Sequence, residues 1–318
     1  MNSRDTFRRL PTGNLFLAVL LLALNPAVGR AGECDKVPSP AAWIFCDDFE
    51  DGTALVREGR YFEYVDDDGE FIPVAGAGLN GSVGMRAIWQ TGEVGAGNFK
   101  LGFGRNPSSY MDQGIRPEED FREIYYRMYV RMEPGWQGNP FKLSRATVIA
   151  ASDWSQAMIA HVWEGGGDVL GVDPVRCVGA GDQVVCIGYN DFSNMSWLGF
   201  QGGTTPVFHP DESGRWLCVE AHVRLNDPGA SNGVQEFWID GQLEARRDGL
   251  DFVHGYTDYA INAVFFENWW NGGAIRDQER YFDNIVVSTQ PIGCEALGSV
   301  FDDDFESGTT SAWSASVP

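Results

Sequence analysis

The residues that could bind an acidic sugar lie in one alternating segment, residues 122–132. Its apolar side chains fall on one face of an expected β-strand, and its polar side chains, Tyr125, Arg127, Tyr129 and Arg131, fall on the other. Guanidinium groups pair with carboxylates as two-pronged forks, and tyrosine rings can stack on pyranose rings. This stripe would therefore suit a uronic-acid polymer. The alternative is that it faces solvent on the convex side of a sheet, where alternating Arg and Tyr are common.

The elements that must position such residues are clearest in residues 215–247. Residues 216–226 alternate with period two, which is typical of a half-buried strand. The following segment, 226–233, is rich in turn-forming residues. A second strand is expected over 234–239, and Asp240-Gly241 supplies the positive φ angles of a tight hairpin that returns through 242–246.

The rest of the chain also favours strands, and helical patterns are scarce. Thr91 to Asn98 is Gly-rich and is expected to be irregular, and the chain over 61–74 is expected to form a hairpin around Asp66-Asp67-Asp68-Gly69. That acidic turn lacks the distal acidic residue of an EF-hand loop, so we interpret it as a turn and not as a calcium loop. An entry strand is expected within 43–52, and further strands are expected at 83–89, 147–151, 156–163, 259–266 and 278–288.

Three motifs carry a resemblance to a known fold. They are the entry segment D-D-F-E-x-G at 47–52, the run W-x-C-x-E-x-H with its F-W-I-D-G hairpin, and Y-F-D-N-I-V-V-S at 281–288. Together they resemble the concanavalin A-like jelly roll, nearest to bacterial sugar-binding domains and to polysaccharide lyases of the heparin, glucuronan and alginate type. The resemblance implies an all-β, two-sheet antiparallel sandwich that engages a polysaccharide.

A lyase of this kind must neutralise a uronate carboxylate, remove the C5 proton and protonate the leaving oxygen. The resembling families use His and Tyr on neighbouring strands, which suggests His161 as base, Tyr189 as acid, Arg127 as carboxylate clamp and Gln156 as helper. The remaining candidate sugar contacts are Tyr125, Tyr129, Arg131, Trp163, Glu220, His222, Trp269 and Trp270.

Other interpretations of these residues remain open. His222 with Glu220 competes with His161 for the catalytic role, and a buried structural histidine is common at any single position. The lyase signatures R-x-E-L-R and Q-I-H are absent from the sequence. A glycosidase would need two carboxylates at a defined separation, and the E-x-D-x-x-E strand of the retaining glucanases is also absent. A non-catalytic carbohydrate-binding or adhesive domain is therefore the main alternative to a lyase.

The resemblance also implies a structural calcium ion where the first and last strands meet. Its expected ligands are Asp48, Glu50 and Asp283, together with backbone carbonyls. Solvated acidic residues at strand ends are the alternative. No other cofactor is expected.

Length and charge limit the partners. A chain of 318 residues fits one large β domain, and a net charge of −22 argues against nucleic acid, which needs a basic surface. The charge does not argue against an acidic glycan, because a local basic cleft would suffice. We expect a monomer.

The amino terminus is expected to direct export. Arg4, Arg8 and Arg9 precede an apolar run of about ten residues over 15–24, which is typical of a secretory signal peptide and too short to span a bilayer. We expect a signal peptide at 1–31, the jelly roll at 32–294 and a flexible tail at 295–318. The mature protein is expected to be secreted, periplasmic or at the cell surface, with no transmembrane segment. The tail repeats the entry motif as F-D-D-D-F-E-S-G-T at 301–309.

Six cysteines in an exported chain are expected to form disulfides. Cys177 and Cys186 flank an expected hairpin and should pair. The other four allow three pairings. We favour Cys34 with Cys294, because these two bracket the domain, which leaves Cys46 with Cys218. Zinc is disfavoured because no C-x-x-C spacing is present.

Overall fold

The computed structural model describes residues 32–35 and 41–294. The expected signal peptide and the expected C-terminal tail lie outside this part of the chain. Among the described residues, no helix has both the length and the apolar character needed to cross a membrane.

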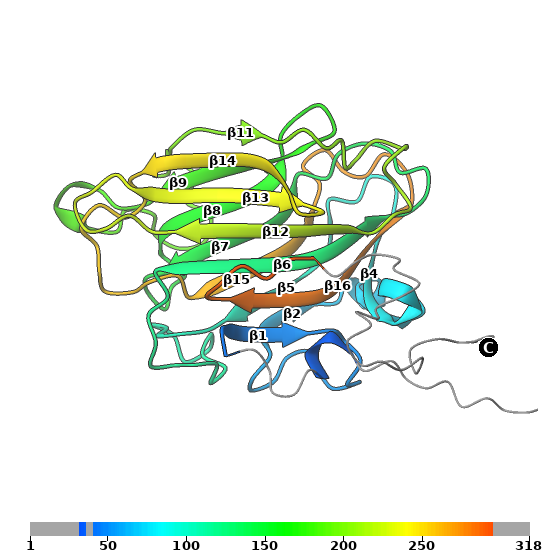
Figure 1. Ribbon diagram of the computed structural model, residues 1–318, viewed down its shortest axis with the longest axis horizontal. Coiled ribbons are helices and arrows are strands. Elements are labelled where there is room, and N and C mark those ends of the chain that lie inside the picture. Colours follow the sequence, from blue (N-terminus) through cyan, green and yellow to red (C-terminus); the bar gives the residue numbers. More distant parts are fainter. Residues whose placement is uncertain (1–31, 36–40, 295–318) are drawn as a thin grey trace, which may run out of the picture. The chain divides into compact units, whose positions relative to one another are not determined.

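Two antiparallel sheets of eight strands each make up the fold, and Figure 1 shows them one in front of the other. Sheet A has the order β14 (Gln242–Leu250), β13 (Gly233–Ile239), β12 (Leu217–Arg224), β6 (Glu123–Met132), β16 (Gln278–Ser288), β4 (Val83–Trp89) and β3 (Ile72–Ala75), with β1 (Trp43–Asp47) also pairing with β16. Sheet B has the order β10 (Ser196–Trp197), β9 (Leu170–Arg176), β8 (Gln156–Glu164), β7 (Lys142–Ile149), β15 (Ala263–Trp269), β5 (Gly95–Gly102) and β2 (Tyr61–Val65), with β11 (Gln201–Gly202) pairing with β9. Short 3-10 turns lie at Glu33–Asp35, Asp67–Gly69, Leu79–Gly81 and Ala180–Asp182.

Period-two alternation explains how the sheets pack. On β6 the residues Ile124, Tyr126, Met128 and Val130 point into one continuous apolar core between the sheets, while the alternate residues point away from it. The expected all-β sandwich is therefore confirmed, and strands β4 and β16 have the bounds that the sequence predicts. The turn between β13 and β14 is also confirmed, because Asp240 and Gly241 have φ angles of 50° and 79°, as a type I′ hairpin requires.

Three local expectations are wrong. Residues 95–102 form strand β5, although the Gly-rich run from Thr91 to Asn98 suggested an irregular segment. Strands β2 and β3 do not form a hairpin, because β2 pairs with β5 in sheet B and β3 pairs with β4 in sheet A. The acidic turn at 66–69 therefore carries the chain from one sheet to the other. Trp270, suggested by the sequence as a sugar contact, is only 6% exposed and packs against Trp89 and Trp136.

The disulfides agree with the sequence in one case of three. Cys177 pairs with Cys186 as expected, but the other bridges are Cys34–Cys46 and Cys218–Cys294. The favoured pairing of Cys34 with Cys294 is wrong because the two ends of the domain are fastened to different strands. Cys46 lies on β1 and holds the segment before it, whereas Cys218 on β12 holds the segment that follows β16.

A bulge shapes the part of sheet B that matters below. On β7, Lys142 and Ser144 face Trp163 and Val162 of β8, so two residues of β7 span one of β8. The bulge turns Lys142 to the outer face of sheet B, the face away from sheet A, where Arg145 also lies. Strand β15 is irregular at the same level, between Phe266 and Trp269.

Arg280 stabilises this irregular region from the other sheet. Its side chain is fully buried and donates to the carbonyl oxygens of Glu267 (2.8 Å) and Lys142 (3.3 Å) and to Asn268 Oδ1 (3.0 Å). Its guanidinium also lies 5.0 Å from the ring centre of Trp89. Burial lowers the pKa of Arg280 to about 9. The backbone carbonyls of Lys142 and Glu267, which lie where the strands leave regular pairing, thus accept hydrogen bonds from the Arg280 guanidinium, which crosses the core.

We expect Arg280→Met to destabilise the protein by roughly 3 kcal/mol or more, because several buried acceptors lose their donors at once. Urea denaturation would measure the change. The control is Arg276→Met, since Arg276 is 45% exposed on the preceding loop, and the expected change there is within about 0.5 kcal/mol. Equal stability of the two variants would contradict this account of the bulge.

Candidate functional site

A row of side chains, all polar except Phe265, crosses the outer face of sheet B. The row follows direct cross-strand pairing through five neighbouring strands, β5, β15, β7, β8 and β9, with β2 at its edge. In order, its members are Glu63, Lys100, Phe265, Arg145, His161 and Asp173. Because facing residues of antiparallel strands lie on the same side of the sheet, the pairing alone brings these groups together.

Arg145, near the centre of the row, forms a hydrogen-bonded cluster with Tyr189, Asn190 and Glu267. Arg145 donates to Tyr189 Oη, to Glu267 Oε1 (3.1 Å) and to Asn190 Oδ1 (2.8 Å). The Tyr189 hydroxyl donates to Glu267 Oε1 at 2.9 Å. Strands β7 and β15 supply Arg145 and Glu267, while Tyr189 and Asn190 come from the loop that follows Cys186.

Charge in the cluster sets the protonation of its members. Burial raises the pKa of Glu267, but Arg145 and Lys142 outweigh it and lower the value to about 2. Burial raises the pKa of Tyr189 well above its usual range, and Glu267 adds to this rise. Burial lowers the pKa of Lys142, whose Nζ is 3.4 Å from Glu267 Oε1. At neutral pH the cluster therefore holds an ionised carboxylate next to a protonated phenol.

Two pockets lie on either side of this cluster. The larger, about 600 Å³, is lined by Phe141, Lys142, Trp163, Asp173, Trp197 and Trp269, among others, and Asn190 also borders it. The smaller, about 270 Å³, is lined by Glu63, Lys100, Asp153, Trp154 and Tyr189. Neighbouring loop residues Tyr189 and Asn190 thus face opposite pockets, so an extended ligand that occupies both would cross the cluster.

His161 is buried behind Trp163 and Trp197, which line the larger pocket. Its ring stacks on Trp163 with 4.0 Å between ring centres, and Trp197 stacks on the pair at 5.9 and 5.7 Å. His161 Nδ1 is 3.2 Å from the backbone oxygen of Asp173. Burial, followed by the charge of Arg145, lowers the pKa of His161 to about 3. The imidazole is therefore neutral at ordinary pH, and it is almost completely enclosed.

Several residues suggested by the sequence do meet on this face. His161 and Trp163 lie on β8, and Trp269 ends β15 with 43% of its surface exposed. Tyr189 reaches the cluster from its loop. Gln156, also on β8, is buried beside this group and donates to Thr147 Oγ1 at 2.9 Å.

Other sequence candidates lie on the outer face of sheet A, away from this cluster. The pairing of β6, β12 and β16 places there Tyr125, Arg127, Tyr129, Arg131, Glu220 and His222. Arg127 is 1% exposed and forms an ion pair with Glu33. Glu220 accepts hydrogen bonds from the backbone of Ile292 and Gly293. The two end segments thus cover much of this face, and the structure separates Arg127 from His161 and Tyr189.

His222 forms a separate arrangement on the same face. Its Nδ1 is 2.7 Å from Glu236 and its Nε2 is 2.8 Å from Glu123, and Tyr125 stacks on its ring at 4.2 Å. Both ring nitrogens are thus engaged by carboxylates, and the ring is buried. Arg131 lies over the rings of Trp216 and Tyr281.

Sequence reasoning missed Lys100, Lys142, Arg145 and Glu267. One expected strand began at 147, after Lys142 and Arg145, and another ended at 266, one residue before Glu267. The bulge at Lys142 breaks the alternation that would have marked it. Lys100 lies on β5, whose glycines suggested an irregular segment.

The expected calcium ligands divide into two groups. Asp48 accepts hydrogen bonds from the backbone of Cys34 and Glu50, so both of its oxygens are engaged. Asp283 Oδ2 accepts from Leu79 N (2.6 Å) and Ser82 Oγ (2.9 Å), while Glu50 accepts from Val83 N in the same turn. Burial, with a contribution from Glu50, raises the pKa of Asp283 to about 7. Asn284 N donates to Asp283 Oδ1 at 2.7 Å, so both carboxylate oxygens of Asp283 are engaged, as those of Asp48 are.

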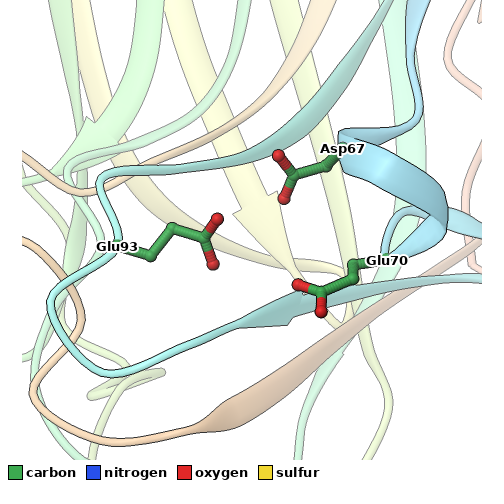
Figure 2. A group of neighbouring side chains, drawn as sticks. All are labelled: Asp67, Glu70 and Glu93. Carbon is green, nitrogen blue, oxygen red and sulfur yellow. The ribbon is translucent and has the colours of Figure 1, made fainter.

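A second acidic group lies elsewhere, as Figure 2 shows: the carboxylates of Asp67, Glu70 and Glu93 point towards one another. Their ligand atoms lie within 4.8 Å of one another. Burial, then Glu93 and Glu70, raises the pKa of Asp67 to about 6. Gln90 donates to both Glu70 and Glu93. The acidic residues alone do not define a metal site, and we assign none.

Comparison with known proteins identifies the fold but no family. No family model matches the sequence, and no curated protein matches it. Among solved structures, the marine PL-14 alginate lyase from Aplysia kurodai is similar, with a TM-score of 0.54 and 10% identity over 79% of this chain and 100% of that one. The alginate lyase vAL-1 from a Chlorella virus has a TM-score of 0.50 and 12% identity over 72% and 91%. An endo-β-1,4-glucuronan lyase from Trichoderma reesei has a TM-score of 0.49 and 14% identity over 78% and 96%. The chain has the jelly-roll sandwich fold of the first two.

The buried neutral His161 predicts a pH effect on stability. The ordinary pKa of 6.5 falls to about 3 in the folded state, so between these values the unfolded chain binds a proton that the folded chain does not. The free energy of unfolding should therefore fall as the pH is lowered from neutral to about 4. In His161→Phe the contribution of this histidine to the pH dependence should disappear. The midpoint of urea unfolding should then fall less between neutral pH and about pH 4 than it does in the wild type. The same change at the exposed His209 should leave the slope unaltered, and identical slopes for wild type and His161→Phe would refute the assignment.

Proposed function

We propose that this protein is a polysaccharide lyase that cleaves a uronate-containing glycan by β-elimination. The observation that carries the proposal is the cluster of Arg145, Tyr189 and Glu267, with Lys142 beside it, between two pockets on the open face of sheet B. The solved structures with the same fold include alginate lyases, which supports the choice of acidic glycans as substrates.

The residues of the cluster match the steps of the reaction. Arg145 is fully buried beneath Tyr189 and Asn190. When the sugar displaces this loop, Arg145 would pair with the uronate carboxylate in place of Glu267 and so make the C5 proton more acidic. In its resting state Lys142 pairs with Glu267 as a cation. Burial lowers its pKa and so makes the free amine more accessible, and in that form Lys142 would accept the C5 proton. As the C4–O4 bond breaks and the C4–C5 double bond forms, Tyr189 would donate its proton to the leaving O4. The products are a 4,5-unsaturated uronate and a shortened chain, and no water is consumed.

This assignment moves the clamp from Arg127 to Arg145 and the base from His161 to Lys142. Arg127 is held by Glu33 under the amino-terminal segment. The low pKa of His161 makes it a weak base, and the stacked indole rings enclose it. Tyr189 keeps the role of acid that the sequence suggested.

The decisive test is formation of the unsaturated product, followed by ultraviolet absorbance. We expect Tyr189→Phe, Lys142→Gln and Arg145→Met each to reduce kcat by about 10²-fold or more, as is usual when an acid–base group is removed. The matched control is Tyr125→Phe on sheet A, which should retain activity. Full activity of Tyr189→Phe would contradict the proposed mechanism.

A non-catalytic sugar-binding domain is the second candidate. The stacked rings of Trp163 and Trp197 and the exposed Trp269 favour it, because aromatic faces bind sugars without any proton transfer. Calorimetric binding of acidic glycans with no unsaturated product, and with unchanged affinity in Lys142→Gln, would establish this function instead.

Three disulfides fit an extracellular protein, and with the apolar run at 15–24 they support export as part of the proposal.

We further propose that Glu50 and Asp283 bind a structural calcium ion, because both carboxylates accept hydrogen bonds from the segment Leu79 to Val83, and burial, with a smaller contribution from Glu50, raises the pKa of Asp283. Millimolar calcium should raise the melting temperature and EDTA should reverse the rise. Asp283→Asn should abolish the calcium effect, whereas Asp67→Asn in the other acidic group should preserve it. A melting temperature that neither calcium nor EDTA changes would exclude the site.

A further inference from the structure

Charges around the central cluster are almost fully matched. Lys100 forms an ion pair with Glu63. Glu267 Oε1 serves both Arg145 and Lys142, at 3.1 and 3.4 Å. The cluster therefore carries at most one positive charge in excess of Glu267. That single excess charge is next to Tyr189, where the reacting sugar would lie.

Both adjoining pockets contain a further carboxylate. Asp173 lines the larger pocket, and no cation pairs with its side chain within the part of the chain that the structure describes. Burial raises its pKa to about 6, so the carboxylate is the main form at neutral pH and a protonated fraction is present. Asp153 lines the smaller pocket, where hydrogen bonds from Ser155 lower its pKa. In total, three cations face four carboxylates over the pockets and cluster: Lys100, Lys142 and Arg145 against Glu63, Asp153, Asp173 and Glu267.

The larger pocket offers aromatic surface in place of charge. Its exposed rings include Trp197 and Trp269, each 43% exposed, and Trp197 stacks on the buried Trp163 with ring centres 5.7 Å apart. Such surfaces suit the apolar face of a neutral pyranose. They supply no partner for a carboxylate, because the nearest cation, Lys142, already pairs with Glu267.

We propose that the substrate is a glycan in which uronic acid alternates with an uncharged sugar, and not a homopolymer of uronic acid. The inference rests on the proposed lyase function. One uronate would lie at Arg145 and Tyr189, and an uncharged ring would stack in the pocket of Trp163 and Trp197.

Like-charge repulsion is the physical reason. A homopolyuronate carries a carboxylate on every ring, so the sugar next to the reacting one would bring its charge towards Asp173 or Asp153. Placing like charges together in a partly buried site costs affinity, and such repulsive elements are a common means of rejecting a related ligand. The overall charge of −22 adds to the repulsion of a polyanion.

The test compares two classes of glycan on the full-length protein. Hyaluronan and unsulfated chondroitin alternate uronate with N-acetylhexosamine, whereas alginate and glucuronan are homopolyuronates. Turnover is followed by absorbance of the unsaturated product, and binding is measured by calorimetry with Tyr189→Phe. We expect kcat/KM and affinity to be at least about tenfold higher for the alternating polymers, which corresponds to one unfavourable charge contact.

Asp173→Asn provides the specific readout. Removing this charge should lower KM for alginate or glucuronan about fivefold relative to KM for the alternating polymers. The matched control is Asp248→Asn, which makes the same change of net charge at a residue 71% exposed on β14 of sheet A, and it should alter neither class.

The outcomes separate the inference from the function on which it rests. Absence of unsaturated product from all four polymers would reject the lyase, and the binding order would still test the choice of glycan. Tighter binding or faster turnover of alginate or glucuronan, unaffected by Asp173→Asn, would overturn the inference. Preference for the alternating polymers, weakened by Asp173→Asn but not by Asp248→Asn, would support it.

Discussion

The geometry of the site depends on one buried cation. Arg280 crosses the apolar core from sheet A and donates to the carbonyls of Lys142 and Glu267, the two places where β7 and β15 leave regular pairing. Without a donor these carbonyls would remain unsatisfied in the core, at a cost that a marginally stable fold can ill tolerate. Because the bulge persists, Lys142 and Arg145 share a face although they are three residues apart. The arrangement of Lys142 and Arg145 on the outer face thus depends on the hydrogen bonds that Arg280 makes inside the sandwich.

The two outer faces of the sandwich have different surroundings. Both carry alternating cations and aromatic rings, and either could bind a sugar on composition alone. On sheet A the segments before β1 and after β16 lie against the strands, held by the bridges Cys34–Cys46 and Cys218–Cys294, and their contacts engage Arg127 and Glu220. On sheet B the loops leave two pockets on either side of the cluster. Because the end segments cover the polar face of sheet A and leave that of sheet B open, we place the candidate site on sheet B.

Electrostatic balance links this site to the rest of the molecule. A strongly acidic protein would have to concentrate positive charge locally in order to bind an acidic glycan, as proposed, and here Arg145 and Lys142 share one carboxylate, Glu267. The shared pairing keeps the cations in place while leaving a small positive excess for one ligand carboxylate. The same pairing lowers the pKa of Glu267 and, with burial, keeps Tyr189 protonated. Selectivity and reactivity are therefore proposed to arise from the same few contacts.

The sequence by itself determined the sandwich, because period-two alternation needs only local order: β4 and β16 were predicted at their bounds, and the faces of β6 and β12 were predicted correctly. It also indicated the Cys177–Cys186 bridge and the grouping of His161, Trp163 and Tyr189. It could not place Arg127 or His222 relative to them, since alternation tells which residues share a face but not what covers that face. Lys142 was hidden by the bulge, and two disulfides depended on where distant chain ends meet. These features were decided only by the tertiary structure, because bulges, covering segments and cross-sheet hydrogen bonds arise from contacts between residues far apart in the chain.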